Sequence, residues 1–100
     1  MIKHNERGDT MTVVLEGELD HHSAERMRTE LESLIASPHV KHLVLDLGKL
    51  SFMDSSGIGV VLGRYKTLAR RGGSVAVRSP NAHVDRIFAM SGLYQIVDKL

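Results

Sequence analysis

The apolar positions of this chain follow two different periods, one typical of strands and one typical of helices. In residues Thr10–Glu16 every second side chain is apolar, which predicts a half-buried strand. Arg7-Gly8-Asp9 before it has the composition of a turn, so residues 2–6 are predicted to form the other arm of a hairpin. Three later runs of apolar residues predict further strands: His42–Leu47, Ser74–Arg78 and a short last strand at Leu93–Val97.

Three segments carry apolar residues at helical spacing, and each is bounded by residues that start or stop helices. Asp20 or Ser23 is expected to cap the first helix, and Pro38 ends it. Two glycines end the second helix after a basic last turn, and a proline opens the third near its first turn. The predicted helices are residues 23–37, 55–71 and 79–91.

The regular alternation of strands and helices predicts an α/β fold with a partly parallel sheet. Parallel neighbours require a crossover connection, and each predicted helix is long enough to supply one. The 100 residues suit one domain, residues 1–100, with no linker or repeat. Phe52 and Phe88 are expected in its core. A monomer is expected as well, because the small apolar stripes are all needed to cover the sheet.

Composition narrows the functional classes. The 13 Lys and Arg nearly balance the 12 Asp and Glu, for a net charge of +1, which argues against direct nucleic-acid binding. The absence of cysteine excludes a disulfide scaffold, a thiol nucleophile and a cysteine-ligated metal. No apolar run has the ~20 residues of a membrane span, and the first residues do not open a signal peptide. We therefore expect a cytoplasmic protein that does not bind membranes.

The segment Asp54-Ser55-Ser56-Gly57 carries the strongest candidate chemistry. It connects a buried strand to the second helix, so its side chains are expected at a helix N-terminus near the carboxyl edge of the sheet, where ligand sites are common. One interpretation is a plain helix cap. The other is a hydroxyl presented for phosphorylation, since free N–H groups and the positive helix end can accommodate an added dianion.

A nucleotide-binding module is a weaker alternative. Gly57, Gly59 and Gly63 form G-x-G-x-x-x-G, one residue away from the dinucleotide fingerprint, and no P-loop Lys-Ser/Thr follows. Glycines at this spacing more readily allow close approach of a helix to the sheet or to a partner.

A small enzyme is the other alternative, either a serine hydrolase or a metal-dependent protein built on His21, His22 and Ser55. The nucleophile elbow G-x-S-x-G is absent, because the segment around Ser55 lacks its leading glycine. A metal site would need further ligands from distant histidines. Adjacent histidines before a helix are more often solvated loop residues.

Three segments resemble the STAS domains of bacterial anti-sigma factor antagonists, and the similarity runs from about residue 12 to residue 97. Within this family, two further segments are especially similar to the sporulation branch, which acts on the anti-sigma F factor. The family segments are Gly17–Asp20, Leu43–Leu47 and Phe52–Gly59, and the branch segments are Glu18–His22 and Leu62–Lys66.

The resemblance implies a single STAS-type layer, a mixed and mostly parallel sheet of four to five strands with helices mainly on one face. It implies no enzyme activity, no cofactor and no metal. The unphosphorylated chain would bind an anti-sigma factor that is also a serine kinase and so release the sporulation sigma factor. Phosphorylation on Ser55 would switch binding off, and a serine phosphatase would restore it. A general stress-response antagonist is the alternative within the family. The expected partner-binding residues are Asp20, Asp54, Ser56, Gly57, Ile58 and Ile87.

Overall fold

Alternating apolar side chains build a five-stranded sheet with one well-buried face. The computed structural model describes residues 2–100. Met11, Val13 and Leu15 lie on the buried face and are at most 3% exposed. The first two strands form an antiparallel hairpin, and all other neighbours are parallel, in the order β1-β2-β3-β4-β5. The strands are β1 (Ile2–Arg7), β2 (Thr10–Leu19), β3 (His42–Met53), β4 (Ser74–Arg78) and β5 (Asp98–Lys99).

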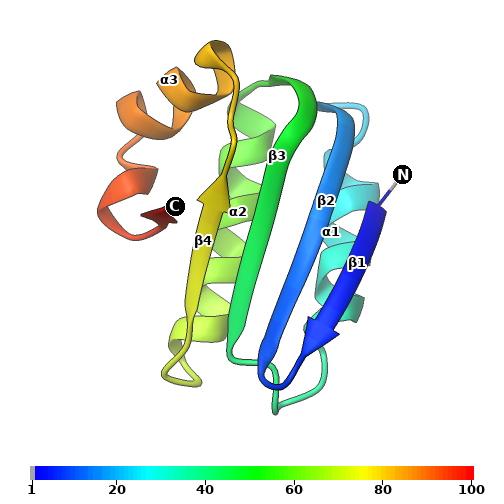
Figure 1. Ribbon diagram of the computed structural model, residues 1–100. Coiled ribbons are helices and arrows are strands. Elements are labelled where there is room, and N and C mark those ends of the chain that lie inside the picture. Colours follow the sequence, from blue (N-terminus) through cyan, green and yellow to red (C-terminus); the bar gives the residue numbers. More distant parts are fainter. Residues whose placement is uncertain (1) are drawn as a thin grey trace.

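Helices cover one face of this sheet, as the resemblance implied. α1 and α2 lie side by side behind the strands, and α3 lies beside the end at which β3 and β4 finish (Figure 1). The three helices are α1 (Ala24–Leu34), α2 (Ser55–Ala69) and α3 (Ala82–Met90). The mixed, mostly parallel sheet and its one-sided helical layer are therefore confirmed. In residues 2–100 no helix combines the length and the hydropathy that a membrane span requires.

Strands β2 and β3 extend well past their predicted ends. β2 continues past Glu16 to Leu19, and β3 continues past Leu47 to Met53, although Gly48 and Lys49 interrupt its apolar alternation. Pairing with β2 keeps this segment extended, and shifts in register after Val14 and after Gly17 absorb the irregularity. The long β3 carries the chain to the edge of the sheet where α2 begins.

The predicted strand Leu93–Val97 is wrong. A 3₁₀ turn (Leu93–Gln95) replaces it, and the only strand residues nearby are the two of β5. Gly92 turns the chain with a φ of 84°, and the Val97 N–H then donates to the Leu93 carbonyl at 2.8 Å. Leu93 and Val97 are both buried, so their helical spacing of four residues determined the local structure.

The start of α3 and the position of Phe52 also differ from prediction. Asn81 caps α3 by accepting from the Val84 N–H at 2.8 Å, so this helix begins after Pro80 rather than with it. Phe88 is fully buried as expected. Phe52 is 38% exposed and stacks on the His83 ring, with centroids 4.9 Å apart.

Candidate functional site

The Asp54 carboxylate joins two segments that are distant in sequence. It caps α2, because its Oδ1 accepts from the Ser56 N–H at 2.8 Å. Its Oδ2 accepts from the His21 N–H in the loop between β2 and α1, at 3.2 Å. One side chain therefore fixes this loop against the start of α2 at the carboxyl edge of the sheet.

Asp20 stabilises the same loop through hydrogen bonds to the two residues that follow His21. Its Oδ1 accepts from the N–H groups of His22 and Ser23, both at 3.0 Å. The Ser23 backbone N–H, helped by the Ser23 hydroxyl, holds the pKa of the Asp20 carboxyl below its ordinary value despite some desolvation. The expected Ser23 cap of α1 does not form, because the Ser23 hydroxyl instead donates to the Glu18 carbonyl at 2.6 Å, and Asp20 accepts from the two N–H groups just before the helix rather than from those inside it. Asp20 is thus a loop-shaping carboxylate that remains partly exposed.

The two adjacent serines have different surroundings. Ser55 is the first residue of α2 and is exposed. It lies on the rim of a groove of about 390 Å³ between α2 and α3. Ser56 is half-buried and borders a separate hollow against α1, together with His21. Of the two hydroxyls, the one on Ser55 is the better presented to another protein.

The groove beside Ser55 is mostly apolar. Ile58 from α2 and Ile87 from α3 are half-buried in it, and Met90 on its rim is 81% exposed. Ile87, which was predicted to bind a partner, therefore lines this groove. Sequence reasoning missed Met90, although its position three residues after Ile87 places it on the same helical face.

Two polar side chains of α3 complete the groove and were also missed. His83 is anchored, because its Nε2 lies 2.9 Å from the Met53 carbonyl, and Arg86 is exposed. Met53 ends β3, so this contact fixes α3 beside the start of α2. No signal in the sequence alone relates these α3 residues to Ser55, because only the packing of the two helices brings them together.

Gly57 is required by close packing. A Cβ at this position would lie 2.7 Å from Met53 Cγ and 2.9 Å from Leu19 Cγ, whereas nothing lies within 4 Å of the corresponding point at Gly59 or Gly63. Close approach of α2 to the sheet thus explains one of the three glycines. All three lie within the helix rather than in a phosphate-binding loop.

Replacing Gly57 by Ala should lower the free energy of unfolding by about 1–3 kcal/mol, the usual cost of overpacking. The matched change Gly59→Ala, on the same helix but in open space, should raise it by about 0.5–1 kcal/mol because alanine favours helix. Urea unfolding of both variants measures the difference. Equal effects at the two positions would contradict the packing of α2 described above.

The residues of the enzyme alternative are not assembled into a reactive site. His21 and His22 contact each other edge to face, with ring centroids 5.6 Å apart. Neither imidazole is hydrogen-bonded to Ser55 in the part of the chain that the structure describes. Across residues 2–100 no three His, Cys, Asp or Glu side chains are grouped as metal ligands.

Known proteins similar to this chain share both its sequence and its fold. The STAS domain model matches residues 1–100. An anti-sigma F factor antagonist of Paenibacillus polymyxa is 46% identical over 87 residues, which are 87% of this chain and 74% of that protein. An anti-sigma-B factor antagonist of Bacillus subtilis is 33% identical over 97% of this chain and 85% of its own length.

Solved structures of anti-sigma factor antagonists have the same fold as this chain. The anti-sigma factor antagonist SpoIIAA in its unphosphorylated form superposes with a TM-score of 0.85 at 33% identity, covering 100% of this chain and 88% of that one. The phosphorylated form of the Bacillus cell fate determinant SpoIIAA superposes with a TM-score of 0.77 at 32% identity, covering 100% of this chain and 91% of that one.

Proposed function

Because this chain belongs to the STAS-domain family of anti-sigma factor antagonists, whose members are regulatory binding proteins and not enzymes, we propose that it binds an anti-sigma factor through the site around Ser55. The partner is a serine kinase that phosphorylates Ser55, and this modification ends binding. By binding the anti-sigma factor, the unphosphorylated chain frees a sigma factor. A serine phosphatase removes the phosphate and so restores binding.

The exposed hydroxyl of Ser55 on the rim of the apolar groove is the observation that carries this proposal. Ile58, Ile87 and Met90 supply the apolar contact area that a partner can bury. A phosphate on Ser55 would stand beside the Asp54 carboxylate and at the edge of that area, where its charge disfavours burial. Asp20, Asp54 and Ser56 are partly exposed near Ser55 and contact the partner as well, whereas the predicted Gly57 is buried and lets the start of α2 pack closely beneath them.

The sporulation branch is favoured over the stress-response branch. Antagonists of the anti-sigma F factor from two organisms are 46% and 39% identical to this chain, whereas the anti-sigma-B antagonists reach 33% and 29%. That SpoIIAA has been solved in a phosphorylated form supports a phosphorylation switch in this chain. The protein acts as a cytoplasmic monomer with residues 1–100 as one domain.

The experiment is intact-mass spectrometry with peptide mapping after incubation with an anti-sigma kinase and ATP. One phosphate is expected, on Ser55, in the wild type and in Ser56→Ala, and none in Ser55→Ala. A phosphate on Ser56 in the wild type would move the site by one residue. An unmodified chain, with the kinase active on another antagonist, would leave Asp54-Ser55-Ser56-Gly57 as a plain helix cap.

A further inference from the structure

The sheet face turned away from α1 and α2 is left open by residues 2–100 (Figure 1). Three of its strands, β2, β3 and β4, run parallel, and parallel strands are usually covered on both faces. A small apolar centre lies in the middle of this face, with Val14 and Val44 half-buried and Ala76 only 9% exposed, and the register places Thr12 and Asp46 beside it. The face is therefore mixed in character, and no layer of the described chain covers it.

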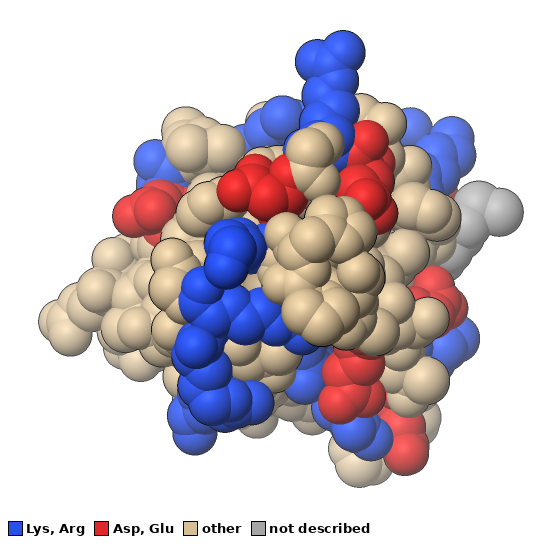
Figure 2. Space-filling model, turned by 90° about the horizontal axis from the view of Figure 1, so that it is seen from below, with Lys and Arg blue, Asp and Glu red and all other residues tan. Residues whose placement is uncertain are grey.

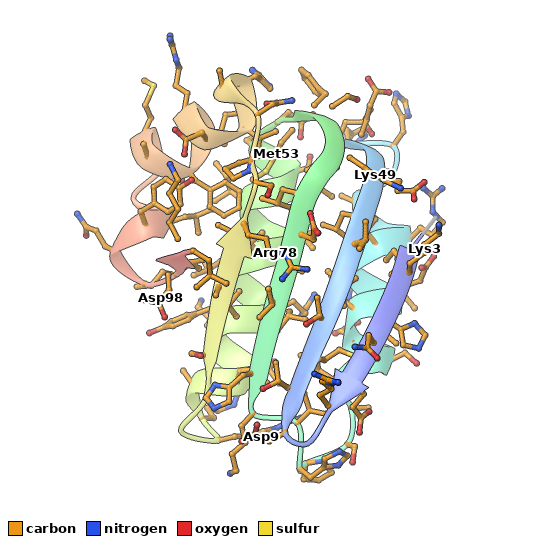
Figure 3. The ribbon with its side chains drawn as sticks, viewed as in Figure 1. Lys3, Asp9, Lys49, Met53, Arg78 and Asp98 are labelled. Atoms are coloured by element: carbon orange, nitrogen blue, oxygen red, sulfur yellow. The ribbon has the colours of Figure 1, made fainter. Side chains whose placement is uncertain are left out.

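Strand register places cations around this apolar centre. Lys3, Val14, Asp46 and Arg78 form one row across β1 to β4. Three strand spacings separate the ends of the row, so the backbones of Lys3 and Arg78 are about 14 Å apart. Arg7 lies four residues from Lys3 along β1, about 13 Å away. Lys3 lies at the β1 edge of the face, and Arg78 lies over its middle (Figure 3).

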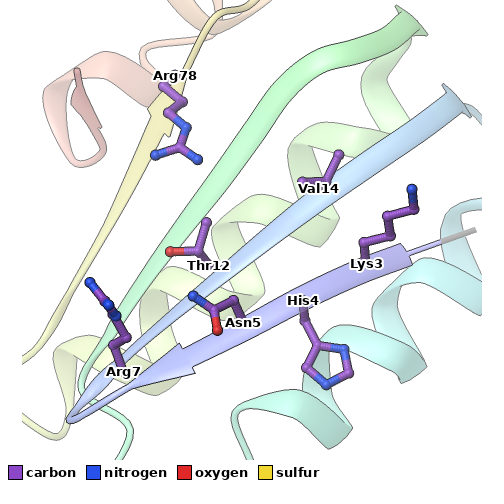
Figure 4. A pocket seen from close by; sticks show the side chains of 7 residues that line it. All are labelled: Lys3, His4, Asn5, Arg7, Thr12, Val14 and Arg78. Atoms are coloured by element: carbon purple, nitrogen blue, oxygen red, sulfur yellow. The ribbon is translucent and has the colours of Figure 1, made fainter.

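The three cations border a shallow hollow of about 440 Å³, whose floor includes Thr12 and Val14 (Figure 4). Within residues 2–100, neither Lys3 nor Arg7 forms a salt bridge. Arg78 is paired within the chain, because Asp46 accepts from Arg78 Nε at 3.3 Å and from the Gly48 N–H at 3.0 Å. The excess positive charge of the hollow therefore comes from Lys3 and Arg7 on β1.

We propose that this open face binds an extended acidic segment of another protein, with carboxylates four residues apart and small or β-branched side chains between them. An extended chain advances about 3.3 Å per residue, so two such carboxylates are about 13 Å apart. That separation matches Lys3 to Arg7 along β1, and Val14 beside Lys3 offers an apolar contact. This surface is separate from the Ser55 groove and does not depend on the proposed switch.

A second group of basic residues, at the end of α2, serves as the control for Lys3 and Arg7. Lys and Arg side chains also form a band at the end of the molecule where α2 finishes (Figure 2). Two cations just after α2 and before β3 are committed to the chain itself, since Arg71 Nη1 donates to the carbonyls of Ile35 and Val40 at 2.8 Å, and Lys41 Nζ donates to the Arg71 carbonyl. Cations here also offset the partial negative charge of the helix C-terminus.

The test is a titration of the ¹⁵N-labelled full chain with the peptide acetyl-Glu-Val-Thr-Val-Glu-amide, followed by amide chemical shifts. Saturable shifts are expected in β1, β2 and β4 around Lys3, Val14 and Arg78. The double variant Lys3→Gln/Arg7→Gln should bind about tenfold more weakly, because two exposed ion pairs with the peptide carboxylates are lost. The matched variant Lys66→Gln/Arg70→Gln, at the end of α2, should bind like the wild type.

Several results would overturn the proposal. They are shifts centred on the end of α2, equal binding of the peptide with both Glu replaced by Gln, the same shifts produced by inorganic phosphate alone, or no saturable shifts at millimolar peptide. Phosphorylation of Ser55 should be unchanged in Lys3→Gln/Arg7→Gln. A failure of the proposed switch would therefore appear in the kinase experiment, and a failure of this inference only in the titration.

Discussion

Phosphorylation of Ser55 is expected to weaken the complex with the anti-sigma factor several-hundredfold. The phosphate adds about −1.5 to −2 charges at pH 7, next to the carboxylate that caps α2. It also stands on the rim of the apolar groove, so binding would require its desolvation. A loss of ~3–4 kcal/mol corresponds to that change in affinity, since each 1.4 kcal/mol is a factor of ten.

Isothermal titration calorimetry of five forms, the wild type, its phosphorylated form and three variants, separates the effect of charge at position 55 from the effect of side-chain size. Ser55→Ala should bind like the wild type, and Ser55→Asp should bind about tenfold more weakly or worse because it adds one charge rather than two. Thr29→Asp, an exposed position on α1, places the same charge outside the groove and should have little effect. Full affinity of the phosphorylated chain would show that Ser55 lies outside the interface.

Much of the site could be predicted because it is local in sequence. Asp54-Ser55-Ser56-Gly57 carries a capping carboxylate, two hydroxyls and a close-packed glycine within four residues, and the structure places them at the start of α2 as expected. On the α3 side of the groove only Ile87 was predicted, although helical spacing also relates Met90 to it. His83 and Arg86 join the site only through the packing of α3 beside the start of α2, which no periodicity encodes.

The fold, like the site, has parts that could be predicted from the local sequence and parts that could not. Strong periodicity identified the three helices and the central strands, because apolar spacing reflects which face is buried. The extension of β3 to Met53 depends on pairing with β2, and the turn at Leu93 depends on the left-handed Gly92 and on two core contacts. Phe52 was expected in the core on hydrophobicity alone, yet it stacks on His83 at the surface. Each error occurs where tertiary contacts outweigh the local pattern.

Gly73→Ala is expected to lower the free energy of unfolding by about 3 kcal/mol, beyond the usual range for a surface change. A Cβ here would lie 1.7 Å from the Lys41 carbonyl oxygen, so the backbone would have to move. That carbonyl accepts from the Ser74 N–H at 2.9 Å, and the Gly73 N–H donates to the Leu68 carbonyl at 2.8 Å. Movement would therefore disturb both the end of α2 and the start of β4.

Urea unfolding followed by circular dichroism measures this loss, with Gly63→Ala as the control. Position 63 is also a glycine of the α2 region but has open space around it, so alanine there should stabilise the chain by about 0.5–1 kcal/mol. The clash predicts that the free energy of unfolding falls in Gly73→Ala and rises in Gly63→Ala. Helix propensity alone cannot account for a large loss of stability at position 73, because this residue lies outside the helix. A wild-type midpoint for Gly73→Ala would mean that the turn from α2 to β4 adapts without cost, and that the β3–β4 pairing does not depend on this close approach.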